Sequence, residues 1–155
     1  MTDGPPLAVT MGEPAGVGGE LTLKAWRERA RAGRPFFALD DPARLAAIAQ
    51  SLRLAVPVKA IGRPAEAHAA FGDALPVLPV PLRVASRAGH PDPANAPATI
   101  EAIERATQMA IDGEIAGFAT NPIQKKTLQE AGFRHPGHTE FLAELASRRS
   151  ARPVR

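Results

Sequence analysis

The chain contains no cysteine and no tyrosine, and only one tryptophan. The lack of cysteine excludes disulfides, zinc–thiolate sites and a cysteine nucleophile. No apolar run is long enough to cross a bilayer, and residues 1–6 lack the charged-then-apolar pattern of an export signal. We therefore expect a cytoplasmic protein that has no membrane partner.

The chain is basic, with a sequence pI of about 9.9, but the excess charge is confined to its end. The remaining 15 basic residues are balanced by 16 acidic ones once four arginines are set aside. With so few aromatic residues among the basic ones, we expect no nucleic-acid partner. The four arginines of this tail are Arg148, Arg149, Arg152 and Arg155.

The first motif is a short apolar run followed by a glycine-rich loop. Residues 7–11 are typical of a buried strand, residues 12–20 contain four glycines, and Leu23 and Trp26 then follow at helical spacing. A strand–loop–helix unit of this kind can bind an anion through backbone N–H groups or let a ligand approach the main chain closely. A simple tight connection is an equally good interpretation. The dinucleotide fingerprint GxGxxG is incomplete because Leu21 stands where the third glycine belongs.

Strands and helices are expected to alternate along the rest of the chain. Strands are predicted at residues 35–39, 56–61 and 115–120, and helices after Pro42, over 98–112 and near 126–130. Prolines recur throughout residues 75–82, so this segment is expected to be extended or an edge strand rather than a central one. The pattern favours an α/β fold of three layers with a mostly parallel sheet. Residues 152–155 resemble the approach to another strand.

The second motif lies at residues 133–142, where a loop turns into a helix. Pro136 and Gly137 indicate a turn, and Thr139 is a candidate N-cap. Imidazole, hydroxyl and carboxylate groups pointing outward here can hold a charged small molecule, although a capped surface helix with two incidental histidines explains the pattern equally well. His135 and His138 have no third ligand at suitable spacing, so we expect no metal site in this chain.

Together, the two motifs resemble those of the 4-hydroxythreonine-4-phosphate dehydrogenase family of vitamin B6 biosynthesis, which has the isocitrate/isopropylmalate-dehydrogenase-like fold. Family members are considerably longer, so the chain resembles a truncated form of such an enzyme, namely its N-terminal half. Two positions depart from the family's usual pattern: Gly19 stands where proline is common, and Gln124 where asparagine or histidine is common. The segments that carry the resemblance are residues 10–20, 120–125, 131–133 and 137–143.

The resemblance implies an NAD-dependent (or NADP-dependent) oxidation, with decarboxylation, of 4-phosphooxy-L-threonine to 3-amino-2-oxopropyl phosphate for pyridoxal phosphate biosynthesis. It assigns His138 and Thr139 to substrate binding, and Lys125 would add positive charge nearby. By analogy with the wider superfamily, the nicotinamide would lie against Gly16, Val17 and Gly18.

The resemblance also implies a homodimer and a divalent metal. In the family, the metal is held by three histidines that lie downstream of the Gly-His-Thr-Glu motif, so we expect the metal ligands outside this chain and the isolated chain to be inactive. Two alternatives remain open: a sister dehydrogenase that oxidises another phosphorylated hydroxy acid or a carboxylated cyclic diol, and a non-catalytic remnant or interaction domain.

Overall fold

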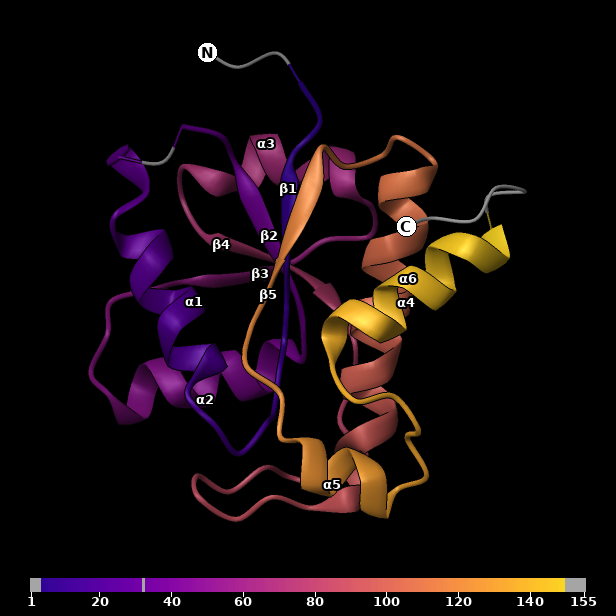
Figure 1. Cartoon of the computed structure of the whole chain (residues 1–155). Coiled ribbons are helices and arrows are strands. Elements are labelled where there is room, and N and C mark those ends of the chain that lie inside the picture. The colour runs from indigo at the N-terminus through magenta and orange to yellow at the C-terminus, as the bar shows by residue number, and fades with distance from the viewer. Residues whose placement is uncertain (1–3, 32, 150–155) are drawn as a thin grey trace.

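The computed structural model describes residues 4–31 and 33–149, and a parallel sheet forms the centre of this part (Figure 1). The strand order is β3-β4-β2-β1-β5, and all four pairings are parallel. The predicted α/β fold is therefore confirmed. The strands are β1 (Leu7–Thr10), β2 (Phe36–Asp40), β3 (Val58–Ala60), β4 (Leu75–Pro79) and β5 (Gly117–Thr120).

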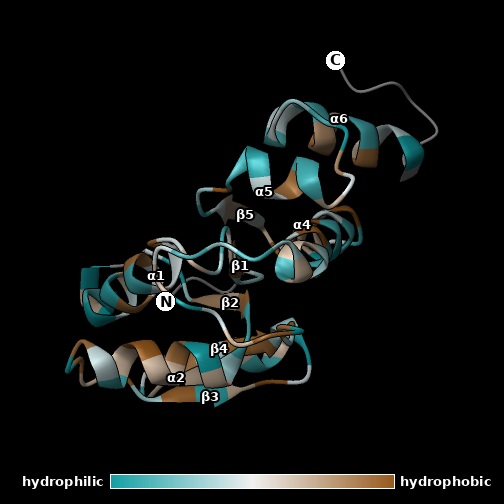
Figure 2. Ribbon diagram, turned by 90° about the horizontal axis from the view of Figure 1, so that it is seen from below, coloured by the Kyte–Doolittle hydropathy of each residue, from teal (hydrophilic) through white to brown (hydrophobic). Residues whose placement is uncertain are grey.

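Helices cover both faces of this sheet, which gives the expected three layers (Figure 2). α1 (Gly18–Arg27) and α2 (Pro42–Ser51) pack on one face, and α3 (Ala67–Phe71) and α4 (Ala96–Ile111) contribute to the cluster on the other. α5 (Lys125–Glu130) follows β5, and α6 (His138–Arg149) packs on α4. In the described part of the chain, the helices are too short or too polar to span a bilayer. Three short 3₁₀ segments complete the set: η1 (Arg29–Arg31), η2 (Pro64–Glu66) and η3 (Pro93–Asn95).

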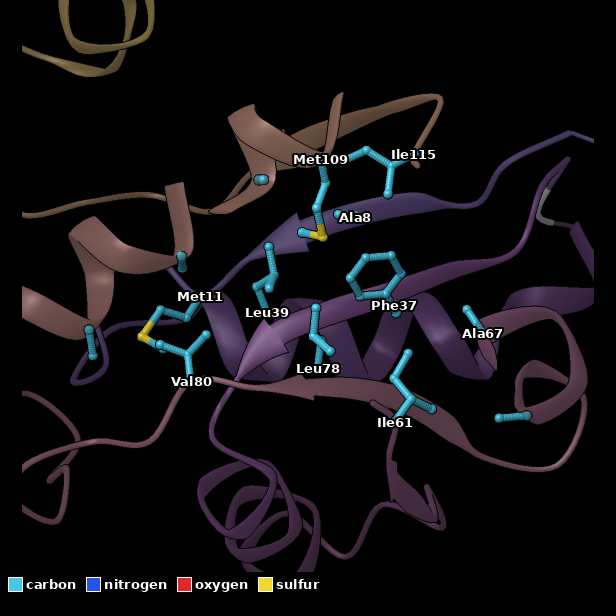
Figure 3. Packing of buried hydrophobic residues seen from close by; sticks show 14 residues of the cluster. Ala8, Met11, Phe37, Leu39, Ile61, Ala67, Leu78, Val80, Met109 and Ile115 are labelled. Atoms are coloured by element: carbon cyan, nitrogen blue, oxygen red, sulfur yellow. The ribbon is translucent and has the colours of Figure 1, made fainter. Parts of the chain in front are cut away.

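The two faces of the sheet bury separate hydrophobic clusters. Phe37 and Leu39 of β2 point toward α4, where Met109 covers them (Figure 3). The alternate residues of β2 point the other way, onto Trp26 and Leu45 of α1 and α2. Every residue of β2 is consequently buried, as expected for a parallel strand covered on both faces.

The prediction for residues 75–82 was wrong, because β4 is an interior strand paired with both β2 and β3. Pro76 lies outside the paired register with β2, and Pro79 lies outside the register with β3. The adjacent amides still donate, from Leu75 to Pro57 O at 2.8 Å and from Val80 to Asp40 O at 2.9 Å. The missing N–H of Pro76 would face β2 and that of Pro79 would face β3, each beyond the paired residues. Neither proline therefore removes a hydrogen bond between strands. The strand predicted at residues 56–61 is present as β3, which lies at one edge of the sheet.

The ends of the helices are partly as predicted. Asp41 caps α2, because its Oδ1 accepts hydrogen bonds from the backbone N–H groups of Ala43 and Arg44. The capping role predicted for Thr139 was wrong: α6 begins at His138, so Thr139 lies in its first turn. The strand expected near residues 152–155 lies outside the described residues.

Candidate active-site edge

The predicted site residues lie in loops and helix starts that follow the carboxyl ends of the strands. The chain places β2 and β4 on one side of β1, and then crosses over to place β5 on the other side. Ligands of open α/β sheets bind where the strand order reverses in this way. The glycine loop (residues 11–17) follows β1, and residues 121–124 follow β5, so both border this point (Figure 2).

Asn121 joins these two loops. Its Nδ2 lies 3.0 Å from Thr10 O, 3.2 Å from Gly18 O and 2.9 Å from Thr22 Oγ1, and the side chain is buried. A backbone hydrogen bond from Glu13 N to Pro122 O, at 2.8 Å, lies beside it. One amide therefore holds together the end of β1, the start of α1 and the end of β5. Sequence reasoning placed residues 120–125 among the family-like segments but missed this role, for which an Asn-Pro pair after an apolar run is the available signal.

Two glycines make this close contact between the loops after β1 and β5, which we call the interlock, sterically possible. Gly12 has a φ of +67°, and a Cβ at this position would lie 2.5 Å from Pro122 O. A Cβ on Gly18 would lie 2.8 Å from Met11 O and 2.9 Å from Asn121 Cβ. Gly18, one of the predicted cofactor residues, is thus buried in packing, whereas Gly16 and Val17 are exposed at the tip of the loop. Those two remain accessible to a ligand.

The loop uses some of its own N–H groups. Ala15 donates to Glu13 Oε1 at 2.9 Å, and Gly16 donates to Glu13 O at 2.9 Å. A buried carboxylate at the base of the loop makes it a poor receptor for a phosphate. Close approach of a group without negative charge to the main chain is the better interpretation of these glycines.

A buried ion pair anchors the other side of the glycine loop. Arg44 Nη1 donates to Asp40 Oδ1 at 2.8 Å and Oδ2 at 2.7 Å, and its Nε and Nη2 donate to Pro14 O at 3.2 and 3.0 Å. Burial raises the pKa of Asp40 above its ordinary value, while the Arg44 guanidinium opposes that shift. Sequence reasoning missed this pair, although an acid and an arginine four residues apart across a helix start were visible.

A hollow of about 570 Å³ opens beside this anchor. It lies between α2, the glycine loop and residues 82–88, which follow β4. Gly16 forms part of its wall, so the exposed tip of the glycine loop adjoins the hollow.

The predicted substrate residues gather at what we call the α5–α6 corner, formed by Lys125, Gly137, His138, Thr139 and Glu140. A Cβ on Gly137 would lie 3.9 Å from Lys125 Nζ and 3.4 Å from Glu140 Oε2, so the lysine ammonium lies close to the start of α6. Lys125 and Thr139 are exposed. The structure thus brings Lys125 next to the residues that flank His138.

His138 is the least satisfied polar side chain of this corner. Its Nε2 is shielded from solvent and has no hydrogen-bond partner. Burial lowers the pKa of His138 below the ordinary 6.5, so the imidazole is neutral at pH 7. A neutral imidazole with an unused nitrogen can orient a ligand through a hydrogen bond.

His135 has a different role. Its Nε2 lies 2.8 Å from Glu144 Oε2, and its ring lies 5.1 Å from Phe133 and 5.0 Å from Phe141 between centroids. These contacts hold the loop that precedes α6 against that helix. Within residues 4–31 and 33–149, no three His, Asp or Glu side chains are grouped as a metal site requires.

Comparison with known proteins identifies the family. The sequence profile of the pyridoxal phosphate biosynthetic protein PdxA matches residues 32–153. The chain belongs to the PdxA family. A 4-hydroxythreonine-4-phosphate dehydrogenase from Methylorubrum populi is 46% identical over 155 residues, which cover 98% of this chain and 44% of that protein.

Solved PdxA-family structures agree with the fold. The 4-hydroxythreonine-4-phosphate dehydrogenase from Klebsiella pneumoniae superposes with a TM-score of 0.82 at 32% identity, over 92% of this chain and 45% of the enzyme. The enzyme from Burkholderia phymatum gives a TM-score of 0.86 at 28% identity, over 94% of this chain and 44% of its own. The chain thus spans less than half the length of the PdxA relatives that it matches.

Proposed function

We propose that this chain contributes the glycine loop and part of the substrate site to an NAD-dependent 4-hydroxythreonine-4-phosphate dehydrogenase. The reaction oxidises 4-phosphooxy-L-threonine at its secondary hydroxyl, and loss of carbon dioxide then leaves 3-amino-2-oxopropyl phosphate for pyridoxal phosphate biosynthesis. Membership of the PdxA family supports the oxidoreductase class. The observation that carries the site is the unpartnered, shielded Nε2 of His138 beside Lys125 and Thr139.

Three residues of the corner have roles that their chemistry allows. His138, neutral at pH 7, accepts or donates one hydrogen bond through Nε2 and so fixes the substrate's orientation. The exposed hydroxyl of Thr139 supplies a second hydrogen bond. Lys125 places a positive charge near the substrate's phosphate or carboxylate.

The glycine loop fits a nicotinamide better than a diphosphate. NAD supplies the hydride acceptor when it is bound. Gly16 and Val17 are exposed and Gly16 has no side chain, so the ring can approach the main chain there, while Gly18 holds the loop against Asn121. The buried Glu13 carboxylate disfavours a phosphate at the same place.

Residues 4–31 and 33–149 contain no group of side chains that fits the divalent metal implied by the family resemblance. The described residues offer no three-ligand group, and His135 is engaged by Glu144. We infer that turnover needs residues present in the longer relatives but outside the aligned part. We also infer that the protein self-associates, as the family resemblance implies.

The proposal is tested by titrating the 155-residue chain with 4-phosphooxy-L-threonine and following its amide resonances. We expect shifts concentrated at Lys125, His138 and Thr139, and weaker binding in a His138→Ala variant. His68→Ala is the matched control, because His68 is exposed on α3, far from the corner in sequence. Shifts elsewhere, or equal binding by the two variants, would contradict the proposed substrate site.

Turnover is a separate test. With NAD, a divalent metal and this substrate, we expect the isolated chain to be slower than a full-length relative by at least about a thousandfold, which corresponds to roughly 4 kcal/mol of activation free energy. Ordinary turnover would show that the aligned part alone is sufficient.

A further inference from the structure

We propose that the open side of the sheet at β5 docks the remaining part of a PdxA-family polypeptide, which adds a strand to β5 and covers the apolar residues beside it. This inference rests on family membership and is independent of the proposed cofactor and substrate. Less than half of each matched relative aligns with this chain. Most of the family polypeptide therefore has no counterpart in the aligned part.

The outer edge of β5 has backbone groups to offer. Within the described residues, β5 pairs with β1 alone and ends the row of strands, as Figure 2 shows. Ala116 N donates to Pro6 O at 2.9 Å. Because donors alternate along a parallel ladder, the N–H and C=O groups of Gly117 and Ala119 point away from β1. Such an edge is a template for a further strand.

The two edges of the sheet differ in sequence. β3, at the opposite edge, carries Lys59 and follows Pro57, and both features discourage a further strand. β5 has the sequence Gly-Phe-Ala-Thr, with neither a charge nor a proline. It thus lacks the features that keep an edge strand free of partners.

The face of the sheet beside α1 is also open at β5. The register aligns Leu7 with Gly117 and Val9 with Ala119, and Val9 packs on the cluster below α1, so all four residues share that face. Leu7 is 37% exposed and Ala119 is exposed as well. A parallel sheet normally has helices over both faces, so apolar residues left in water on one face mark a cover that these residues do not supply.

α1 adds an apolar flank to this opening. Leu21 and Ala25 lie four residues apart on one side of the helix, both exposed, and Leu21 is 49% exposed. Thr22, next to Ala25 around the helix, contacts Asn121 at the end of β5 through a hydrogen bond of 2.9 Å. The flank therefore borders β5. Together with Leu7 and Ala119, these two residues form what we call the β5 patch, a continuous apolar surface of the kind that binds a protein.

The shape of the opening selects the occupant. A second copy of this chain would pair β5 with β5 about a two-fold axis, which joins two sheet edges but leaves the apolar face of each in water. α6, the last described helix, packs on α4 over the opposite face. The rest of a family polypeptide is long enough to provide both a strand for the edge and a cover for the face.

Co-expression gives the first test. The 155-residue chain is produced together with the part of the Methylorubrum populi enzyme that does not align with it. We expect the two to co-purify, and hydrogen exchange at the amides of Gly117 and Ala119 to slow by at least about tenfold relative to the chain alone. The amide of Phe118, which already faces β1, is the internal control and should change less. Fusing the two parts into one polypeptide allows the same comparison if the separate part is insoluble.

Two exposed leucines give a matched pair of variants. Leu21 lies in the β5 patch, whereas Leu52, 42% exposed, follows α2 near β3 at the other end of the sheet. Leu21→Lys should weaken the complex by at least about tenfold, because it places an unpaired charge in the contact. Leu52→Lys should bind as the unmodified chain does. In the fused polypeptide, Leu21→Lys should reduce the added protection at Gly117 and Ala119, and Leu52→Lys should not.

The other outcomes would overturn the inference. Equal weakening by the two variants, or co-purification without protection of Gly117 and Ala119, would place the contact elsewhere. Lack of protection in both the co-expressed and the fused forms would show that the edge stays open. Protection that develops in the 155-residue chain alone as its concentration rises would assign the edge to a second copy. NAD and 4-phosphooxy-L-threonine are absent from these experiments, so the proposed function stands or fails separately.

Discussion

Two regions of the same sheet edge are built in opposite ways. On the glycine-loop side, Asn121 and Arg44 are buried. Asn121 donates hydrogen bonds to Thr10 O and Gly18 O, and Arg44 donates to Pro14 O. At the α5–α6 corner, Lys125 and Thr139 are exposed, and His138 keeps one nitrogen without a partner.

The contrast separates scaffold from site. The glycine-loop side is held by contacts within the chain, so the donors of Asn121 and Arg44 already have partners and few are left to bind a ligand. At the corner, Lys125 and Thr139 are hydrated and free to meet a ligand, and only the shielded Nε2 of His138 lowers stability by lacking a hydrogen bond. Substitutions on the first side should therefore change the free energy of unfolding, and changes at the corner should mainly alter binding and titration.

The largest effect is expected from Arg44→Met. This change leaves the Asp40 carboxylate buried without its partner and should lower the free energy of unfolding by roughly 3–5 kcal/mol, measured by urea denaturation. Arg31→Met is the control, because its pair with Glu28 is solvent-exposed and spaced i,i+3. After screening, that pair should contribute less than about 1 kcal/mol. Equal losses of unfolding free energy in the two variants would mean that the buried pair stabilises the fold no more than an exposed pair does.

The next effect concerns the glycine that closes the interlock. Gly12→Ala combines a left-handed φ with a Cβ 2.5 Å from Pro122 O, and should cost roughly 2–4 kcal/mol of unfolding free energy. Gly113→Ala has a φ of +76° with no atom within 4 Å of its Cβ, so it should cost only roughly 1–2 kcal/mol. The difference between the two isolates the steric contact, and similar melting curves would show that the loop can move away.

A smaller effect is expected from Asn121→Ala. The lost amide leaves Thr10 O and Gly18 O without its hydrogen bonds in a buried place, which should cost about 1–3 kcal/mol. Gln50→Ala, on the exposed side of α2, should stay within about 0.5 kcal/mol. Hydrogen exchange at the Glu13 amide should accelerate in the Asn121 variant alone, because that amide donates across the same junction. Unchanged exchange would mean that the two loops are held together by other contacts.

The scaffold side was only partly predictable from the sequence. Apolar runs located the strands, and the Asp41-Pro42 pair located the start of α2, because these signals are local. Whether Pro76 and Pro79 are tolerated in an interior strand depends on the register with β2 and β3, which no local pattern contains. The contacts of Gly12 and Gly18 with residues more than a hundred positions away in sequence are equally invisible to spacing rules. The corner residues were found through family motifs, and their placement beside one another required the structure.

The smallest expected effect is the contribution of His138, at the α5–α6 corner, to the pH dependence of stability. Burial lowers the pKa of His138 below 6.5, so the unfolded chain takes up this proton first as the pH falls. Stability should therefore decline from about pH 6.5 down to the folded-state pKa, and this component should be missing from a His138→Gln variant measured over the same range. Carbon-bound imidazole resonances followed by NMR should give the lowered pKa directly. Adding 4-phosphooxy-L-threonine should raise it, because an anion beside the ring favours the protonated form. A pKa that stays fixed when the ligand binds would place the ligand away from this nitrogen. The unpartnered Nε2 of His138 would then need another explanation.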